Sequence, residues 1–283
     1  MEEIYINDML QYIDIVERQY AWLFRGVSKK DHTLIASIAR EWNQSLASLV
    51  HLEMMMLDRF KTRAISFLDS PPSNDWEWLI WAQHHGMPTR LLDWSENPLV
   101  GLYFACEKNF KEDGAVYQLT TNLPILKYED STPFGINQDY VIRPPHISPR
   151  IAAQKACFTV SGNPIKPLKQ TGGFSKLIVK SDTKQNLLNE LSRFGIDPST
   201  LFPGLDGLSQ RLAMEINIYK VLYNKNPYHA NNQKQVPQPK PTPPAKSHPT
   251  QPVKPHKMPS QPNNPGMVWP KPSRPGGAMK KKK

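Results

Sequence analysis

Residues 81–106, WAQHHGMPTRLLDWSENPLVGLYFAC, contain two adjacent histidines, an arginine and an aspartate among apolar residues. Histidine exchanges protons near neutral pH because its unperturbed pKa is about 6.5, and arginine presents a planar fork that suits phosphate. An earlier segment, WLFRGV at residues 22–27, places one more arginine between apolar residues and a glycine. Such a concentration of polar groups indicates either a reaction centre or a densely hydrogen-bonded core.

Arg25 lies at the end of a predicted short strand and precedes Gly26. A charged side chain in such apolar company costs free energy unless an anion meets it. Gly26 has no side chain, so a backbone or a ligand could approach closely. We therefore expect Arg25 to bind phosphate. The alternative is a structural salt bridge, with Asp93 as the candidate partner.

His84 and His85 lie where a predicted helix runs into Gly86. Adjacent helical residues point about 100° apart, so one of the two histidines would serve a single centre as general acid or base. The alternative is a neutral histidine that hydrogen-bonds to the backbone. Asp93 is expected either to belong to the functional site or to take part in a hydrogen-bonded network in the core. Trp94 is expected either to stack on a flat ring of a ligand or to pack in the core.

No metal is expected at this segment. His84, His85 and Asp93 lack the i,i+4 histidine spacing of a zinc protease, and no cysteine pair accompanies them. The glycine patterns of Rossmann and P-loop nucleotide sites are also missing from the sequence. The arrangement therefore favours chemistry carried by side chains.

Composition divides the chain in two. Residues 229–283 contain 14 of the 28 prolines, ten lysines, one arginine and no acidic residue. Because the whole chain carries +10 and this segment +11, the remainder carries about −1, so a basic, nucleic-acid-binding body is not indicated. We expect residues 226–283 to form a disordered Pro/Lys-rich tail that could bind a protein or a nucleic acid. No signal peptide or transmembrane segment is visible, and a cytoplasmic location is expected.

Hydrophobic periodicity and capping residues predict the elements of residues 1–225. The expected helices are 7–19, 42–68, 75–85, 96–108, 182–195 and 208–223. The expected strands are 21–27, 115–121, 140–143, 156–160 and 176–180. Since helices and strands segregate rather than alternate, we predict one α+β domain with a mostly antiparallel sheet.

The segments LFRGV, QHHGMPTRLLDWSENPLVGLYFA, RIAAQKACF and LFPGLDGL resemble the FRG-domain family in their order and spacing. The family takes its name from the tripeptide found here as Phe24, Arg25 and Gly26. This resemblance extends over nearly all of the expected body, which implies that residues 1–225 form an FRG domain.

At the level of fold, the chain also resembles the Arg-Ser-Glu class of ADP-ribosyltransferases. Arg25 closing an early strand is similar to their first motif, and DWSENPLVGLYFA, which contains Ser95, is similar to their second. Their third motif is a strand glutamate, for which RIAAQKACF offers Gln154. An amide can hydrogen-bond a ribose hydroxyl, whereas a carboxylate can also stabilise an oxocarbenium ion.

This resemblance implies an ADP-ribosyltransferase or an NAD glycohydrolase with NAD as substrate, an activity that would suit a toxin or a phage-defence effector. The implied ligand-binding residues are Arg25, Gly26, Arg90, Trp94 and Ser95. The expected catalytic residues are Gln154, from this resemblance, and His84, His85 and Asp93, from the chemistry of their side chains. Two alternatives remain open. A non-enzymatic nucleotide-sensing or interaction domain is favoured by Gln154 in place of glutamate, and an enzyme acting on nucleic acid is favoured only by the basic tail.

Overall fold

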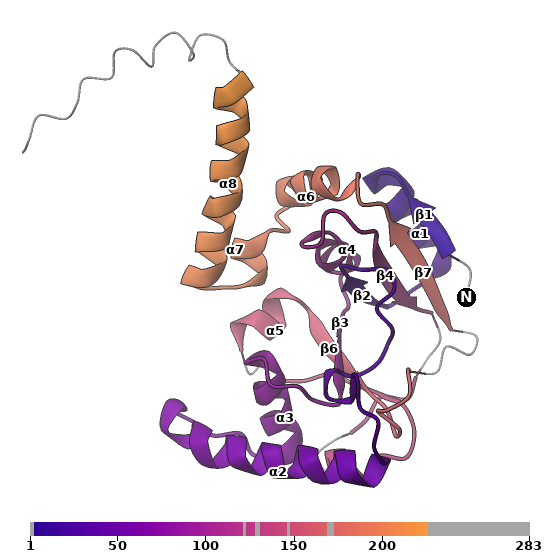
Figure 1. Cartoon of the computed structure of the whole chain (residues 1–283), viewed down its shortest axis with the longest axis vertical. Helices are drawn as coiled ribbons and strands as arrows, with labels where there is room; N and C mark the ends of the chain where they lie inside the picture. The colour runs from indigo at the N-terminus through magenta and orange to yellow at the C-terminus, as the bar shows by residue number, and fades with distance from the viewer. Residues whose placement is uncertain (1–2, 121–122, 128–130, 146–147, 169–172, 226–283) are drawn as a thin grey trace, which may run out of the picture. The chain divides into compact units, whose positions relative to one another are not determined.

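The computed structural model describes residues 3–120, 123–127, 131–145, 148–168 and 173–225 (Figure 1). The tail expected at residues 226–283 lies outside the described residues. Its expected binding of a protein or a nucleic acid therefore stays a prediction. Within the described ranges, none of the helices combines the length and the apolar character needed to cross a bilayer.

Seven strands form one sheet in the order β1-β7-β4-β2-β3-β6-β5. The strands are β1 (Glu3–Ile6), β2 (Leu23–Val27), β3 (Leu91–Ser95), β4 (Gly114–Leu119), β5 (Tyr140–Ile142), β6 (Ala156–Val160) and β7 (Phe174–Val179). Only β1 and β7 run parallel, and every other neighbouring pair is antiparallel. The predicted α+β class with a mostly antiparallel sheet is confirmed.

The helices of the described chain fall at both ends and between the strands. They are α1 (Met9–Gln19), α2 (Leu46–Ala64), α3 (Asp75–His84), α4 (Pro98–Cys106), α5 (Pro149–Ala153), α6 (Lys184–Arg193), α7 (Pro198–Leu201) and α8 (Leu205–Lys225). Single 3-10 turns occupy Ser37–Ala39, Ile65–Phe67 and Pro133–Gly135. The helix expected from residue 42 begins later, because the Ser45 side chain accepts a hydrogen bond from the Ser48 amide and caps α2 there.

Alternating side chains give the sheet two different faces. One face carries a continuous cluster, here called the rear cluster, whose strand residues include Leu23, Leu92, Trp94, Tyr117 and Cys157. The other face carries two separate clusters. The α4 cluster covers the β1-β7-β4-β2 half and includes Phe24 and Val116. The α3 cluster covers the β3-β6-β5 half and includes Leu91 and Phe158. The boundary between these two clusters falls between β2 and β3.

Candidate functional site

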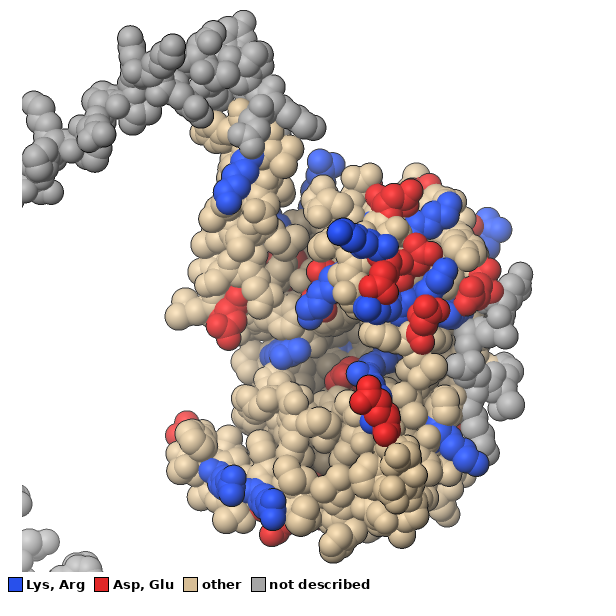
Figure 2. All heavy atoms as spheres, viewed as in Figure 1, with Lys and Arg blue, Asp and Glu red and all other residues tan. Residues whose placement is uncertain are grey.

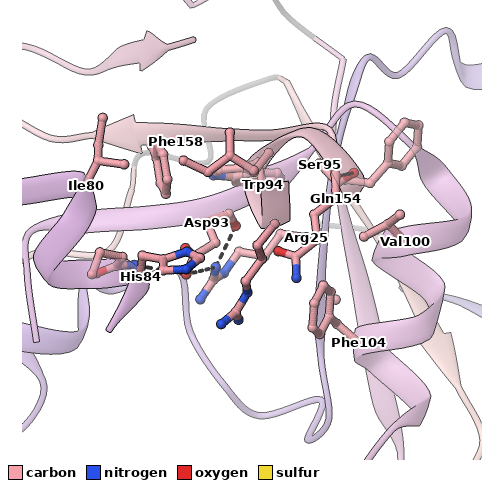
Figure 3. Close-up of a pocket in the computed structure, with 16 residues that line it drawn as sticks. Arg25, Ile80, His84, Asp93, Trp94, Ser95, Val100, Phe104, Gln154 and Phe158 are labelled. Atoms are coloured by element: carbon pink, nitrogen blue, oxygen red, sulfur yellow. Dashed lines mark hydrogen bonds and ion pairs between the residues drawn. The ribbon is translucent and has the colours of Figure 1, made fainter. Parts of the chain in front are cut away.

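The inner cavity, of about 260 Å³, lies at this boundary (Figure 3). Its apolar walls come from the α4 cluster and the α3 cluster, through Phe24, Val100 and Phe104 on one side and Ile80, Ile151 and Phe158 on the other. In the space-filling view the described surface is hollowed, with acidic and basic side chains around the hollow (Figure 2). Two packed halves of one sheet thus leave a recess where they meet.

The recess opens because β2 and β3 separate. Their ladder contains a single pair, Phe24 with Ser95, whereas β3 and β6 pair over five residues. Beyond this pair, an arginine side chain takes the place of the backbone ladder. Arg25 Nη1 donates a hydrogen bond of 2.6 Å to the main-chain oxygen of Asp93. The side chain therefore satisfies a strand carbonyl at the point where the neighbouring strand has moved away.

Arg25 has an ion-pair partner and spare donor capacity. Its Nη1 lies 3.6 Å from Asp93 Oδ2, so the salt bridge expected as the alternative is present but long. The Arg25 side chain is 12% exposed and that of Asp93 is 60% exposed. Arg25 Nε is buried without a hydrogen-bond partner in the described structure, and burial lowers the pKa of the guanidinium, against the opposing charge of Asp93. One N–H group of Arg25 is therefore without a partner in the described structure, in a side chain that borders the inner cavity.

Gly26 is required by helix packing. A Cβ atom built at this position would lie 2.0 Å from the Gly101 carbonyl oxygen and 2.6 Å from the Ala105 amide nitrogen. Although Gly26 also borders the inner cavity, the group that approaches it most closely is the backbone of α4. Of the two close approaches expected at Gly26, by a backbone or by a ligand, the structure shows the approach of a backbone.

Gly26→Ala should therefore destabilise the body. The added methyl group overlaps helix backbone, which cannot swing aside as a long side chain can, and overpacking of this kind costs about 1–3 kcal/mol or more. Chemical denaturation of the variant against wild type measures the loss. Gly86→Ala is a control for glycine replacement where nothing lies within 4 Å, although its φ of +88° adds backbone strain. An unchanged unfolding midpoint for Gly26→Ala would contradict this packing role.

The two histidines at the end of α3 face different surroundings. His84 borders the inner cavity, whereas His85 borders only a neighbouring space and stacks on Trp81, with ring centroids 5.4 Å apart. Burial lowers the pKa of His84 to about 4, and the positive charge of Arg150 contributes. His84 is thus a neutral imidazole at pH 7 that can accept a proton. This geometry makes His84, rather than His85, the candidate for proton transfer in the inner cavity.

Acidification should weaken the fold through His84. The folded chain binds this proton only near pH 4, whereas an unfolded chain binds it near pH 6.5. Between these values the unfolded state carries more protons, so stability that is fully present above pH 6.5 is lost as the pH falls towards 4. Denaturant unfolding at pH 7 and pH 5 should show a smaller acid loss for His84→Asn than for wild type. Equal losses in both proteins would contradict the low pKa.

Asp93 and Trp94 point to opposite faces of β3. The Asp93 carboxylate accepts a 3.0 Å hydrogen bond from Gln83 Nε2 on the cavity side. The Trp94 indole is buried in the rear cluster, and its Nε1 donates to Thr159 Oγ1 at 2.9 Å. Trp94 cannot stack on a ligand ring from that position, so the core alternative holds for it.

Ser95 and Gln154 join the strand to the neighbouring helices. Ser95 Oγ donates to the Gln154 main-chain oxygen at 2.7 Å and accepts from the Asn97 amide at 2.9 Å. Gln154 lies at the end of α5, before β6 begins, and its Nε2 donates to the Leu201 oxygen at 3.0 Å. Both residues border the inner cavity, as Figure 3 shows for Gln154 beside Arg25. Their observed bonds position the cavity wall.

Arg90 lies outside the inner cavity, contrary to expectation. It is 2% exposed and pairs with Glu53 of α2, which is fully buried. Arg90 Nε lies 2.6 Å from Glu53 Oε2, and the Arg90 amide donates to Glu53 Oε1 at 2.9 Å. Its Nη1 donates to the Pro133 oxygen at 2.7 Å. These contacts hold the Arg90 guanidinium in the core. The prediction that Arg90 binds phosphate is therefore wrong.

Arg150 is the cavity residue that the sequence reasoning missed. Its guanidinium lies 4.8 Å from the centroid of the Phe202 ring. In the part of the chain that the structure describes, it makes no hydrogen bond or ion pair, so its donors are free for a ligand. A signal was present in RIAAQ, because Arg150 and Gln154 are four residues apart and share one face of a short helix.

Arg150 and His84 also border the outer cavity, a second and wider space of about 770 Å³. Its other walls include His85 at the end of α3, Phe202 after α7 and Asp206 in the first turn of α8. A cation and a neutral imidazole therefore line both cavities.

Comparison with protein-family models matches residues 20–114 to the FRG domain. The matched segment runs from β2 to the start of β4 and contains Arg25, His84 and Asp93, but it ends before Arg150. Searches of curated proteins and of solved structures give no match to this chain. Within the described residues, the histidine, cysteine, aspartate and glutamate side chains form no group of three that could hold a metal ion.

Proposed function

The chain contains an FRG domain, and we propose that its inner cavity binds NAD and cleaves the bond between nicotinamide and ribose. The observation that carries this proposal is the partly satisfied Arg25 beside the partly exposed Asp93, with Arg150 and a neutral His84 at the same cavity. Cations bind the pyrophosphate, a carboxylate faces the developing cation and an imidazole accepts a proton. An activity that consumes NAD fits a toxin or a phage-defence effector.

The dimensions favour a ligand that occupies both cavities. Pockets for drug-sized ligands measure about 300–1,000 Å³, so the inner cavity alone is small for a dinucleotide. The outer cavity adds about 770 Å³ and begins at Arg150 and His84. We place the nicotinamide ribose in the inner cavity, the pyrophosphate between Arg25 and Arg150, and the adenosine in the outer cavity. Arginine forks are suited to the phosphate oxygens.

In the proposed reaction, the bond from ribose C1′ to the nicotinamide nitrogen breaks, and its electron pair neutralises the positively charged ring. The Asp93 carboxylate stabilises the oxocarbenium character that develops at C1′. Water, or a nucleophile of an acceptor, then forms the new bond at C1′ and loses its proton to His84. Asp93 is the one carboxylate among the described residues that line the inner cavity. It takes the role that glutamate has in the enzyme class that the sequence resembles.

A nucleotide sensor without catalysis is the second candidate. The Asp93 carboxylate already contacts Arg25 and Gln83, and the Gln154 amide is bonded to a main-chain oxygen. These bonds would have to be exchanged before either side chain could act on a ribose. Binding alone needs only the free donors of Arg25 and Arg150.

The test is to incubate the full chain with NAD labelled in the nicotinamide ring, and to follow both nicotinamide release and thermal stabilisation. We expect both signals in wild type. Asp93→Asn should keep the stabilisation and release nicotinamide at least about 100-fold more slowly. Asp14→Asn, which changes an exposed α1 carboxylate, is the matched control and should behave as wild type.

The outcomes separate the two candidates. Stabilisation by NAD without nicotinamide release would support the sensor and reject the enzyme. If NAD neither stabilises the protein nor is consumed, both forms of the NAD proposal fail.

A further inference from the structure

Arg25 holds Asp93 by two unequal contacts, both made by Nη1 (Figure 3). The hydrogen bond to the Asp93 main-chain oxygen is 2.6 Å long, which is short even for a charged donor. The distance to the carboxylate oxygen Oδ2 is 3.6 Å, which is too long for a hydrogen bond, so only the attraction of opposite charges acts there. The main-chain bond therefore fixes Arg25, and the carboxylate contact can be exchanged while Arg25 stays in place.

The Arg25 guanidinium also has a donor that a ligand can reach. Its Nη2 makes no hydrogen bond with the described residues, and Nε is the one nitrogen of this side chain that is both buried and unpaired. The side chain is 12% exposed and borders the inner cavity. Since Nη2 is not fully buried, a phosphate in the inner cavity can bind Nη2 while Nη1 keeps its bond to the Asp93 main chain.

The Asp93 carboxylate readily gives up its contact with Arg25. The Asp93 side chain is 60% exposed, so water solvates the carboxylate when Arg25 takes another anion. Ion pairs with a solvent-exposed member contribute little to stability. The other contact of the carboxylate, the hydrogen bond from Gln83 Nε2, is shorter at 3.0 Å. Of these two partners, Arg25 is therefore the one that a ligand exchanges first.

Arg25 opposes the chemistry of Asp93 as long as the two side chains are paired. Positive charge develops at ribose C1′ when the bond to nicotinamide breaks, and the carboxylate stabilises that charge. The guanidinium beside the same carboxylate repels the developing charge, and water screens it poorly because Arg25 is only 12% exposed. A phosphate bound to Arg25 neutralises this repulsion. The carboxylate therefore acts with its full charge only when an anion occupies Arg25.

We propose that the phosphate of the ligand replaces the Asp93 carboxylate at Arg25 and thereby activates the site, an inference that rests on the proposed function. The substrates are then nicotinamide ribosides that carry a 5′-phosphate, a class that includes NAD and nicotinamide mononucleotide. In each, the electron pair of the broken bond passes to nicotinamide, and water adds at C1′ and loses its proton to His84. Nicotinamide riboside, which lacks the phosphate, leaves Arg25 paired with Asp93 and is cleaved slowly.

Isothermal titration calorimetry of the full chain with inorganic pyrophosphate tests the exchange without any reaction. If the anion and the Asp93 carboxylate compete for Arg25, Asp93→Asn should bind pyrophosphate about twofold to fivefold more tightly than wild type, a modest gain because partly exposed ion pairs are weak. Arg25→Ala should bind it about tenfold to a hundredfold more weakly. Glu96→Gln is the matched control, because the Glu96 carboxylate pairs with Arg143 instead, and it should bind pyrophosphate as wild type does.

Steady-state kinetics with nicotinamide mononucleotide and nicotinamide riboside tests the consequence for catalysis. In wild type, kcat should be at least about tenfold higher for the mononucleotide. Arg25→Ala removes the opposing charge, so its kcat for the riboside should rise about tenfold while its KM for the mononucleotide increases. Added pyrophosphate should accelerate riboside cleavage by wild type and leave that by Arg25→Ala unchanged. A merely structural role of Arg25 would instead lower kcat for both compounds together.

The outcomes separate this proposal from the proposed function. Equal kcat values for the two compounds in wild type would overturn the exchange and leave the NAD proposal standing. If wild type cleaves neither compound nor NAD, the proposed function fails, and tighter pyrophosphate binding by Asp93→Asn would still support the exchange. Asp93→Asn keeps the shape of the side chain, so this comparison does not depend on the folding of Arg25→Ala. Pyrophosphate binding that is absent in wild type, unchanged in Asp93→Asn or equally tightened in Glu96→Gln would overturn the exchange.

Discussion

Replacing Glu53 by alanine will lower the free energy of unfolding by about 3–5 kcal/mol, because it leaves Arg90 charged and buried without its partner. The carboxylate is fully buried and bonds to both the backbone amide and the Nε of Arg90. Water cannot solvate the Arg90 charge that remains, because the Arg90 side chain is only 2% exposed. Urea unfolding followed by circular dichroism measures the change.

The double variant Glu53→Met/Arg90→Met is the matched control. Removing both charges leaves no stranded ion, and replacing a buried pair by apolar residues of similar volume is often neutral or stabilising. We expect the double variant to recover most of the stability that Glu53→Ala loses. The carbonyl of Pro133 loses its donor in the double variant, so a residual cost of about 1 kcal/mol should remain. A small loss in Glu53→Ala would contradict the buried pair.

The fold class was predictable because local signals agree with the final packing. Asn97 caps α4 as expected, accepting from the Leu99 amide, and Pro98 occupies the first turn. The apolar strands β4 and β6 also lie where their patterns indicate. Such features depend on residues within a few positions of one another. They carry no information about which strands become neighbours.

Site residues were harder to assign because their roles depend on distant partners. Nothing near Arg90 in the sequence reveals Glu53, which lies 37 residues away on α2. From the sequence alone, Gly26 could make room for a ligand or for a backbone. Only the packing of α4 against β2 shows that a backbone approaches it. The period-two alternation of β3 separates Asp93 from Trp94, but only the assembled sheet shows which face is filled. The cavity itself follows from the separation of β2 and β3, which no local pattern encodes.

Arg25→Ala leaves the carboxylate of Asp93 without its partner, as removal of Arg90 would leave Glu53, but the two carboxylates differ in their exposure to water. Asp93 is 60% exposed and 3.6 Å from Arg25, so water can solvate the carboxylate that remains. We therefore expect only a small loss of melting temperature, which arises because the main-chain oxygen of Asp93 loses its donor. A charge-assisted contact to phosphate contributes about 1.5–3 kcal/mol, which at about 1.4 kcal/mol per decade lowers NAD affinity about tenfold to a hundredfold.

Thermal melts of wild type and Arg25→Ala, each with and without NAD, measure both effects. Arg18→Ala is the matched control, since that arginine is 76% exposed on α1 and should change neither quantity. In wild type, NAD at 100 times its dissociation constant should stabilise the fold by about 2.7 kcal/mol, and the same concentration should stabilise Arg25→Ala much less. A large loss of melting temperature in Arg25→Ala, with no effect of NAD on wild type, would reject dinucleotide binding and leave Arg25 as a structural tie between β2 and β3.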